Sequence, residues 1–117
     1  MAKENIVADK TFSFALKIIT LYKDLSSNKQ EYVLSKQILR SGTSIGANVS
    51  EATEAKSKAD FVHKISIALK AARETEYWIR LLIGAEYISP SNPLKEDINE
   101  VIRILTAIIK TSKENPR

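Results

Sequence analysis

The stretch that decides the fold runs from Gln37 to Glu51 and reads QILRSGTSIGANVSE. On an α-helix with 3.6 residues per turn, this stretch and its flanks present an apolar stripe and a polar stripe side by side. The apolar stripe has the spacing of a bundle core and contains Leu34, Ile38, Ser41, Ile45, Val49 and Ala52. The polar stripe covers roughly 80° of arc and contains Gln37, Arg40, Ser44, Asn48 and Glu51. Since a surface helix normally pairs its apolar stripe with an unpatterned wet face, we predict that a neighbouring helix or chain contacts the polar stripe.

Small residues surround the polar stripe, and Gly42 and Gly46 are among them. Each glycine inside a helix costs about 1 kcal/mol relative to alanine, so a chain that keeps both needs another backbone close to them. The helix that follows has small side chains in its middle, at Ala68, Ala71 and Ala72. We therefore predict that the glycines lie opposite these alanines and that the two helices pack closely.

Composition favours one all-α domain spanning residues 1–117. Hydrophobic residues make up 44% of the chain and charged residues 27%, which is usual for a soluble globular protein. The absence of Cys excludes disulfides, thiolate chemistry and Cys-ligated zinc. No segment has the apolar run that a signal peptide or a membrane span requires, so we expect a cytoplasmic protein.

Hydrophobic periodicity predicts four helices, over about residues 9–26, 30–55, 58–87 and 92–113. Ser57 and Asn92 are the predicted N-caps of the third and fourth helices, and Pro93 suits a first helical turn. Short connections place successive helices antiparallel, so the expected fold is an up-down-up-down four-helix bundle. The first helix carries two neighbouring apolar stripes, both expected in the core: Phe12, Leu16, Ile19 and Tyr22, and Phe14, Ile18, Leu21 and Leu25.

A carboxylate interrupts the apolar seam of the third helix at Glu76. An unpaired carboxylate is costly to bury, so we expect a basic partner, Arg40 foremost, within the chain or across a subunit boundary. Glu74 and Trp78 lie in the same central turns, and the usual place of such a tryptophan is a core or an interface. The predicted set of oligomer or helix contacts is therefore Gln37, Arg40, Ser41, Ser44, Asn48, Glu51, Glu74, Glu76 and Trp78.

Motifs for catalysis lack the context that they require. The segment from Gly42 to Gly46 fits the G-x-S-x-G pattern, but that motif needs a strand before it and a histidine near it. The single histidine, His63, has no ligand spacing around it, and Glu74 and Glu76 point roughly 200° apart on a helix. No Glu-x-x-His pair and no phosphate-binding glycine loop occurs. We therefore expect no catalytic, metal or cofactor site and no enzymatic activity.

The charge balance leans basic, with a formal net charge of +4 and an isoelectric point near 9.3. The excess is spread along the chain and includes no Lys/Arg run, so folding or assembly would have to build a nucleic-acid surface. An ordinary solvated surface accounts equally well for the lysines on either side of residues 37–51. The candidate nucleic-acid contacts among them are Lys36, Lys56, Lys58 and Lys64.

Four segments span nearly the whole chain: TFSFALKI near the start, EYVLSKQILRSGTSIGANVSEA, KADFVHKISIALKAARETEYWIRLL and INEVIRILTAIIKTSK. Together they resemble the bacterial four-helix-bundle protein family, also called the 23S rRNA intervening-sequence proteins. The most specific parts are R-S-x-x-S-I-x-x-N-x-x-E, from Arg40 to Glu51, and E-T-E-Y-W, from Glu74 to Trp78. The resemblance implies a bundle that assembles into a ring-like homopentamer. The chain is also similar to the accessory protein of diversity-generating retroelements, a pentamer that binds a reverse transcriptase and nucleic acid through a basic outer surface.

Three hypotheses on function follow from the residues and the resemblance. The first is a non-enzymatic homo-oligomeric bundle that binds nucleic acid, RNA in particular. Assembly would combine the small net positive charge of each chain into a strongly charged ring. The second is an accessory or scaffold subunit that binds a protein partner such as a reverse transcriptase. The third is an enzyme, which would require a metal or cofactor that no motif in the sequence indicates.

Overall fold

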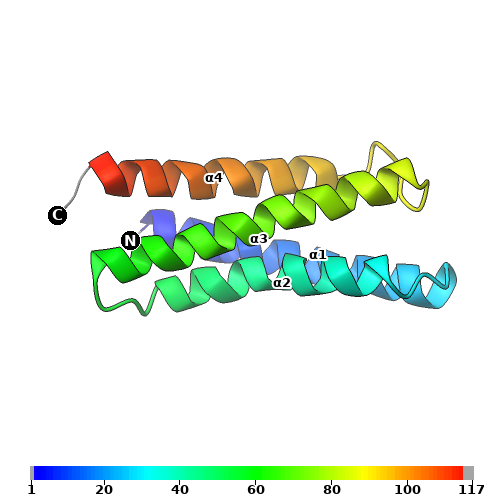
Figure 1. Cartoon of the computed structure of the whole chain (residues 1–117), viewed down its shortest axis with the longest axis horizontal. Helices are drawn as coiled ribbons and strands as arrows, with labels where there is room; N and C mark the ends of the chain where they lie inside the picture. Colours follow the sequence, from blue (N-terminus) through cyan, green and yellow to red (C-terminus); the bar gives the residue numbers. More distant parts are fainter. Residues whose placement is uncertain (1, 115–117) are drawn as a thin grey trace.

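The computed structural model describes residues 2–114, with side chains from Ile6 onward, and its four long helices pack as an all-α bundle (Figure 1). The helices are α1 (Ala2–Lys23), α2 (Leu34–Ala52), α3 (Lys58–Gly84) and α4 (Leu94–Glu114). Successive helices run in opposite directions, each packs against the next, and α4 closes the bundle against α1. The bundle is elongated, with extents of 49 × 22 × 20 Å. No helix within the described range is long and apolar enough to cross a membrane.

The start of α1 and the first connection differ most from the sequence prediction. α1 begins at Ala2 rather than near residue 9, and it continues into a π-helical turn, η1, over Asp24–Asn28. α2 begins at Leu34 rather than near residue 30, and ends at Ala52 rather than near residue 55. Gln30 has a left-handed backbone, with φ of 55°, and this conformation keeps it out of the helix.

Glu31 caps the late start of α2. Its carboxylate accepts hydrogen bonds from the backbone N–H groups of Leu34, at 3.0 Å, and Ser35, at 2.7 Å. Burial favours the neutral form of Glu31, but these bonds and a third from Val33 outweigh burial and lower its pKa. The carboxylate thus stays ionised at the positive end of the helix dipole.

The two predicted N-caps are confirmed. The Ser57 hydroxyl accepts a hydrogen bond from the backbone N–H of Asp60 at 3.1 Å, which starts α3. Asn92 Oδ1 accepts one from the backbone N–H of Leu94 at 2.9 Å, which starts α4. Both caps satisfy backbone donors that have no partner within the helix.

The core is built on seams with heptad spacing. The buried seam of α3 advances in steps of three and four and consists of Ile65, Ala68, Ala72, Thr75, Ile79 and Leu82. Thr75 is fully buried, whereas the Glu76 side chain is 34% exposed and lies 4.0 Å from Arg80 Nε. The prediction that Glu76 lies on the seam is therefore wrong, because the heptad register selects the residue before it.

The same spacing decides which stripe of α1 is buried. The buried one consists of Val7, Thr11, Phe14, Ile18, Leu21 and Leu25, the last of these in η1. On the neighbouring stripe, Phe12 is 66% exposed and Leu16 is 51% exposed. The prediction that both stripes lie in the core is wrong for these two residues, because α2 and α4 together cover only one heptad seam of α1.

Gly42 and Gly46 of α2 face α1, so the prediction that they lie opposite the alanines of α3 is wrong. A Cβ atom at Gly46 would lie 3.3 Å from the backbone carbonyl oxygen of Thr11. A Cβ atom at Gly42 would lie 2.8 Å from Cγ1 of the buried Ile18. The predicted close approach of another backbone is confirmed at Gly46, and α1 supplies that backbone.

Gly42→Ala should destabilise the bundle, because the new methyl group would overlap Ile18, which is completely buried. We expect a loss of about 1–2 kcal/mol in the free energy of unfolding, after the gain in helix propensity is subtracted. Gly84→Ala is the matched control, since nothing lies within 4 Å of its Cβ position and the change should be neutral or stabilising. Urea denaturation measures both variants, and equal stabilities would contradict this account of the α1–α2 contact.

Candidate contact surfaces of the bundle

The polar stripe of α2 lies along its contact with α3, and a buried pair of hydroxyl groups lies beside the stripe, inside that contact. The hydroxyls of Ser41 and Thr75 hydrogen-bond each other at 2.9 Å, and neither residue is exposed. Thr75 Oγ1 also lies 2.8 Å from the carbonyl oxygen of Ala71, a donor–acceptor distance for a hydrogen bond. Ala68 and Ala72 are buried on the same helix. Small side chains therefore allow the two helices to approach closely here.

An ion pair joins the two helices at the solvent edge of this contact. Arg40 Nη2 contacts Glu74 Oε2 and lies 3.2 Å from Gln37 Oε1. The same Glu74 oxygen accepts a hydrogen bond from Trp78 Nε1 at 3.1 Å. Arg40 is thus paired with Glu74, so the choice of Arg40 as the partner of Glu76 is wrong. The basic group nearest to Glu76 is Arg80, at 4.0 Å on the same helix.

The far end of the polar stripe is held by a second ion pair. Lys64 Nζ lies 2.8 Å from Glu51 Oε1, and this hydrogen bond raises the pKa of Lys64. Between the two ion pairs, the Ser44 hydroxyl donates to the Ser41 carbonyl at 3.1 Å, and Asn48 Nδ2 donates to the Ser44 carbonyl at 2.8 Å. Ser44 and Asn48 are half-buried, so part of the stripe remains accessible.

The four lysines proposed to contact nucleic acid do not gather in one patch. Lys36 is exposed in the first turn of α2, whereas Lys56 is exposed in the loop after this helix and Lys58 begins α3. The length of α2 separates Lys36 from that loop by about 25 Å, at 1.5 Å per residue. Lys64 is already engaged by Glu51.

α3 instead presents a basic outer face that the reading of the sequence missed. Its exposed positions include three bases and no acid, while its acids, Asp60, Glu74 and Glu76, are half-buried. Steps of three and four along the sequence could have revealed this face, which is turned away from the buried seam. The set that we call the α3 outer strip consists of Lys70, Arg73, Tyr77 and Arg80.

The cations of the α3 outer strip are only weakly neutralised. Among the side chains that the structure describes, Ile6 to Glu114, Lys70 and Arg73 form no ion pair, and Arg80 has only the long contact of 4.0 Å with Glu76. Tyr77 lies among these cations and is 49% exposed. The strip is therefore open to an anionic or aromatic ligand.

An apolar groove runs between α1 and α2, and we call it the α1–α2 groove. The exposed ring of Phe12 stands on its α1 side, and Gly46, Ala47 and Ser50 line its α2 side. Its volume is about 460 Å³. A large apolar side chain beside small ones is a common arrangement at protein–protein contacts.

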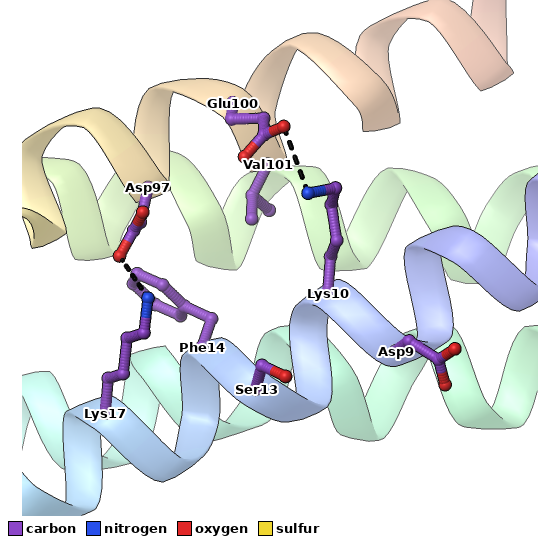
Figure 2. A pocket seen from close by; sticks show the side chains of 8 residues that line it. All are labelled: Asp9, Lys10, Ser13, Phe14, Lys17, Asp97, Glu100 and Val101. Carbon is purple, nitrogen blue, oxygen red and sulfur yellow. Dashed lines mark hydrogen bonds and ion pairs between the residues drawn. The ribbon is translucent and has the colours of Figure 1, made fainter.

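Two ion pairs cross the cleft between α1 and α4 (Figure 2). Lys10 Nζ lies 3.1 Å from Glu100 Oε2, and Lys17 Nζ lies 2.9 Å from Asp97 Oδ2. The cleft has a volume of about 210 Å³, and Phe14 is among the residues that line it. Since a carboxylate matches each of these lysines, the cleft offers little free positive charge to an anionic ligand.

The serine of the G-x-S-x-G pattern has none of the geometry of a catalytic nucleophile. Ser44 lies inside α2, and its hydroxyl donates to a carbonyl of the same helix instead of a histidine. His63 is exposed on α3. Within the part of the chain that the structure describes, no group of three His, Cys, Asp or Glu side chains is placed to hold a metal ion.

Comparison with known proteins agrees with the bundle geometry. The sequence profile described as 23S rRNA-intervening sequence protein matches residues 3–107. A crystal structure of a protein of unknown function from Bacteroides thetaiotaomicron, of the S23 ribosomal protein family, is 53% identical to this chain. The match covers 92% of this chain and 98% of that one, with a TM-score of 0.90. No curated protein matches the chain.

Thr75→Ala should destabilise the bundle, because it leaves the buried Ser41 hydroxyl without its partner on α3. We expect a loss of about 1–3 kcal/mol in the free energy of unfolding. The double variant Ser41→Ala/Thr75→Val should recover much of this loss, since no polar group is then left unpaired.

Thermal and urea denaturation of Ser41→Ala, Thr75→Val and their double variant form a double-mutant cycle that measures this coupling. Arg40→Ala is the control at the solvent edge, where the arginine side chain is 60% exposed. It should cost less than about 1 kcal/mol, as exposed ion pairs do. Strictly additive effects of the two hydroxyl substitutions would show that the pair contributes nothing as a pair.

Proposed function

The chain belongs to the 23S rRNA-intervening sequence protein family, and from this premise we propose that it is a non-enzymatic homo-oligomeric bundle that binds RNA. The α3 outer strip is the observation that carries the proposal. Lys70, Arg73 and Arg80 are exposed on one side of a helix whose acids are all half-buried. Phosphate groups of a nucleic-acid backbone are the natural ligands of such a row of cations.

Charge elsewhere on the bundle supports the choice of this face. The lysines of the α1–α4 cleft are matched by Asp97 and Glu100. Lys64, one of the candidates from the sequence, is held by Glu51. We therefore expect a polyanion to bind first along α3, where three exposed cations have no exposed acid on the same helix, and contacts to Lys36, Lys56 and Lys58 would be secondary.

Assembly would make the modest charge of one chain effective. Each chain carries a formal net charge of +4, and a ring of chains concentrates that charge on one particle, which raises both affinity and association rate. The α1–α2 groove supports self-association, because Phe12 is 66% exposed beside small residues. A homopentamer is the assembly that the family resemblance favours.

A non-enzymatic role fits the positions of the residues that might suggest chemistry. Ser44 is hydrogen-bonded within its own helix, and His63 is exposed with no acid on the outer face of α3 beside it. These residues supply neither an activated nucleophile nor an oriented base. Binding is the activity that the arrangement of charges supports.

The second candidate function is an accessory subunit that binds a protein partner, such as a reverse transcriptase. One observation favours it: Tyr32 is 55% exposed and Val33 is 70% exposed in the segment just before α2. Adjacent exposed apolar residues of this size are typical of a protein contact. This segment is distinct from both the α3 outer strip and the α1–α2 groove, so a partner could bind there without displacing RNA.

The charge-removing variant Lys70→Gln/Arg73→Gln should bind RNA more weakly than the wild-type protein and with a smaller dependence on salt. Fluorescence anisotropy with labelled RNA, repeated over a series of salt concentrations, measures both quantities. Each lost phosphate contact should reduce the slope of log K against log salt by about 0.7–0.9. The control Lys23→Gln/Lys95→Gln removes the same charge from exposed positions outside α3 and should change binding less. Wild-type binding that is indifferent to salt, or equal effects of the two variants, would refute the proposed site.

Phe12→Asp should shift the protein toward monomer, because it places a charge at the apolar edge of the α1–α2 groove. Light scattering over a range of concentrations gives the mass in solution. Thr106→Asp adds the same charge at an exposed position of α4 and should leave the mass unchanged. A wild-type protein that is monomeric at every concentration would end the proposal of self-association.

A further inference from the structure

We propose that the α3 outer strip binds single-stranded RNA in preference to duplex, with an unpaired base stacked on the ring of Tyr77. This inference rests on the proposed function and adds the form of nucleic acid that the site accepts. Tyr77 is 49% exposed, and it follows Arg73 by four residues and precedes Arg80 by three. Residues at these spacings are neighbours on one side of a helix, so cations flank the ring along the helix axis.

The ring of Tyr77 is held in place by a chain of contacts that begins on α2. Tyr77 and Trp78 meet edge to face, with ring centroids 5.3 Å apart and planes inclined at 64°. Trp78 Nε1 donates to Glu74, and Glu74 is held in turn by Arg40. A ring fixed in this way loses little freedom when a ligand covers it, which favours binding.

The chemistry of the strip fits a single strand better than a duplex. Bases in a duplex are stacked on one another, and the grooves of an RNA helix offer an aromatic side chain no free base face. A single strand exposes its bases for stacking and still presents phosphates to flanking cations. Lys70 and Arg80 lie about 15 Å apart along the helix, so the strip would contact a short stretch of the strand.

Leu81 extends the apolar surface next to this ring. It is 36% exposed and follows Tyr77 by four residues, which puts it on the same side of α3. A base on Tyr77 would thus meet an apolar neighbour on one flank and arginine side chains on the others. No contact in this arrangement reads a base edge, so the site should tolerate any sequence that leaves bases unpaired.

The test compares three RNA ligands of equal length, about 12 nucleotides, which lies within the range of known single-strand sites. They are oligouridine, an abasic ribose-phosphate strand with the same charge, and a duplex. Trp78 is the single tryptophan of the chain, so its emission reports on events at the adjacent Tyr77. We expect oligouridine to bind roughly tenfold or more tightly than the abasic strand and to change the emission of Trp78, which the abasic strand should not.

Variants of Tyr77 separate stacking from charge. Tyr77→Leu should weaken oligouridine binding by roughly tenfold and leave binding of the abasic strand unchanged, while Tyr77→Phe should retain the preference. Thermal melts check that both variants are folded, and Lys70→Gln/Arg73→Gln should weaken all three ligands together.

The outcomes distinguish the inference from the function on which it rests. Equal affinity for the three ligands, with no effect of Tyr77→Leu, would overturn base stacking and leave RNA binding by charge intact. Tighter binding of the duplex than of oligouridine would likewise overturn the preference for a single strand. Failure of every RNA to bind at low salt would overturn both proposals.

Discussion

Close approach of α2 to its neighbours on both sides is the constraint on which the rest of the bundle depends. On one side, Gly46 admits the backbone of α1, and a methyl group at Gly42 would collide with Ile18. On the other side, the hydroxyls of Ser41 and Thr75 meet in a buried pair against α3. Small residues at both contacts set the separations of three helices, and the heptad seams follow from those separations.

Because these seams are narrow, the outside of the bundle has an apolar face on one side and a basic face on another. Because the core uses one heptad seam of α1, Phe12 and Leu16 remain exposed and border an apolar groove. Because the acids of α3 are half-buried, its outer positions are left with cations and Tyr77. Self-association and RNA binding are thus proposed for separate surfaces, so each can operate without obstructing the other.

The sequence was a good guide to features that depend on neighbouring residues. The bundle and the caps at Ser57 and Asn92 were predicted because cap and turn chemistry acts within a few residues. The placement of Glu76 on the seam of α3 was wrong because Thr75 and Glu76 follow Ala72 by three and four residues, and only the packed register shows which of the two is buried.

Features that depend on a neighbouring helix were beyond the reach of the sequence. The apolar periodicity of α1 shows that Phe12 could be buried but not whether a helix covers it. The partner of Arg40 was assigned to the wrong glutamate for the same reason. The spacing of the bases along the sequence could have indicated the α3 outer strip. Its net positive charge, however, depends on the burial of the acids beside it, which the sequence does not show.

The cleft between α1 and α4 has a consequence for how the bundle responds to its ionic surroundings. It is bridged by Lys10–Glu100 and Lys17–Asp97 at partly exposed positions, and α1 and α4 make the least extensive contact among the neighbouring helices. The α2–α3 contact also has two ion pairs at its edge, but it encloses the buried Ser41–Thr75 pair. Mobile counter-ions screen such bridges and leave apolar burial largely untouched. Salt therefore weakens the bridges of both contacts, but it removes a larger share of what holds α1 to α4, so the line between the first and last helices is where the bundle would begin to open.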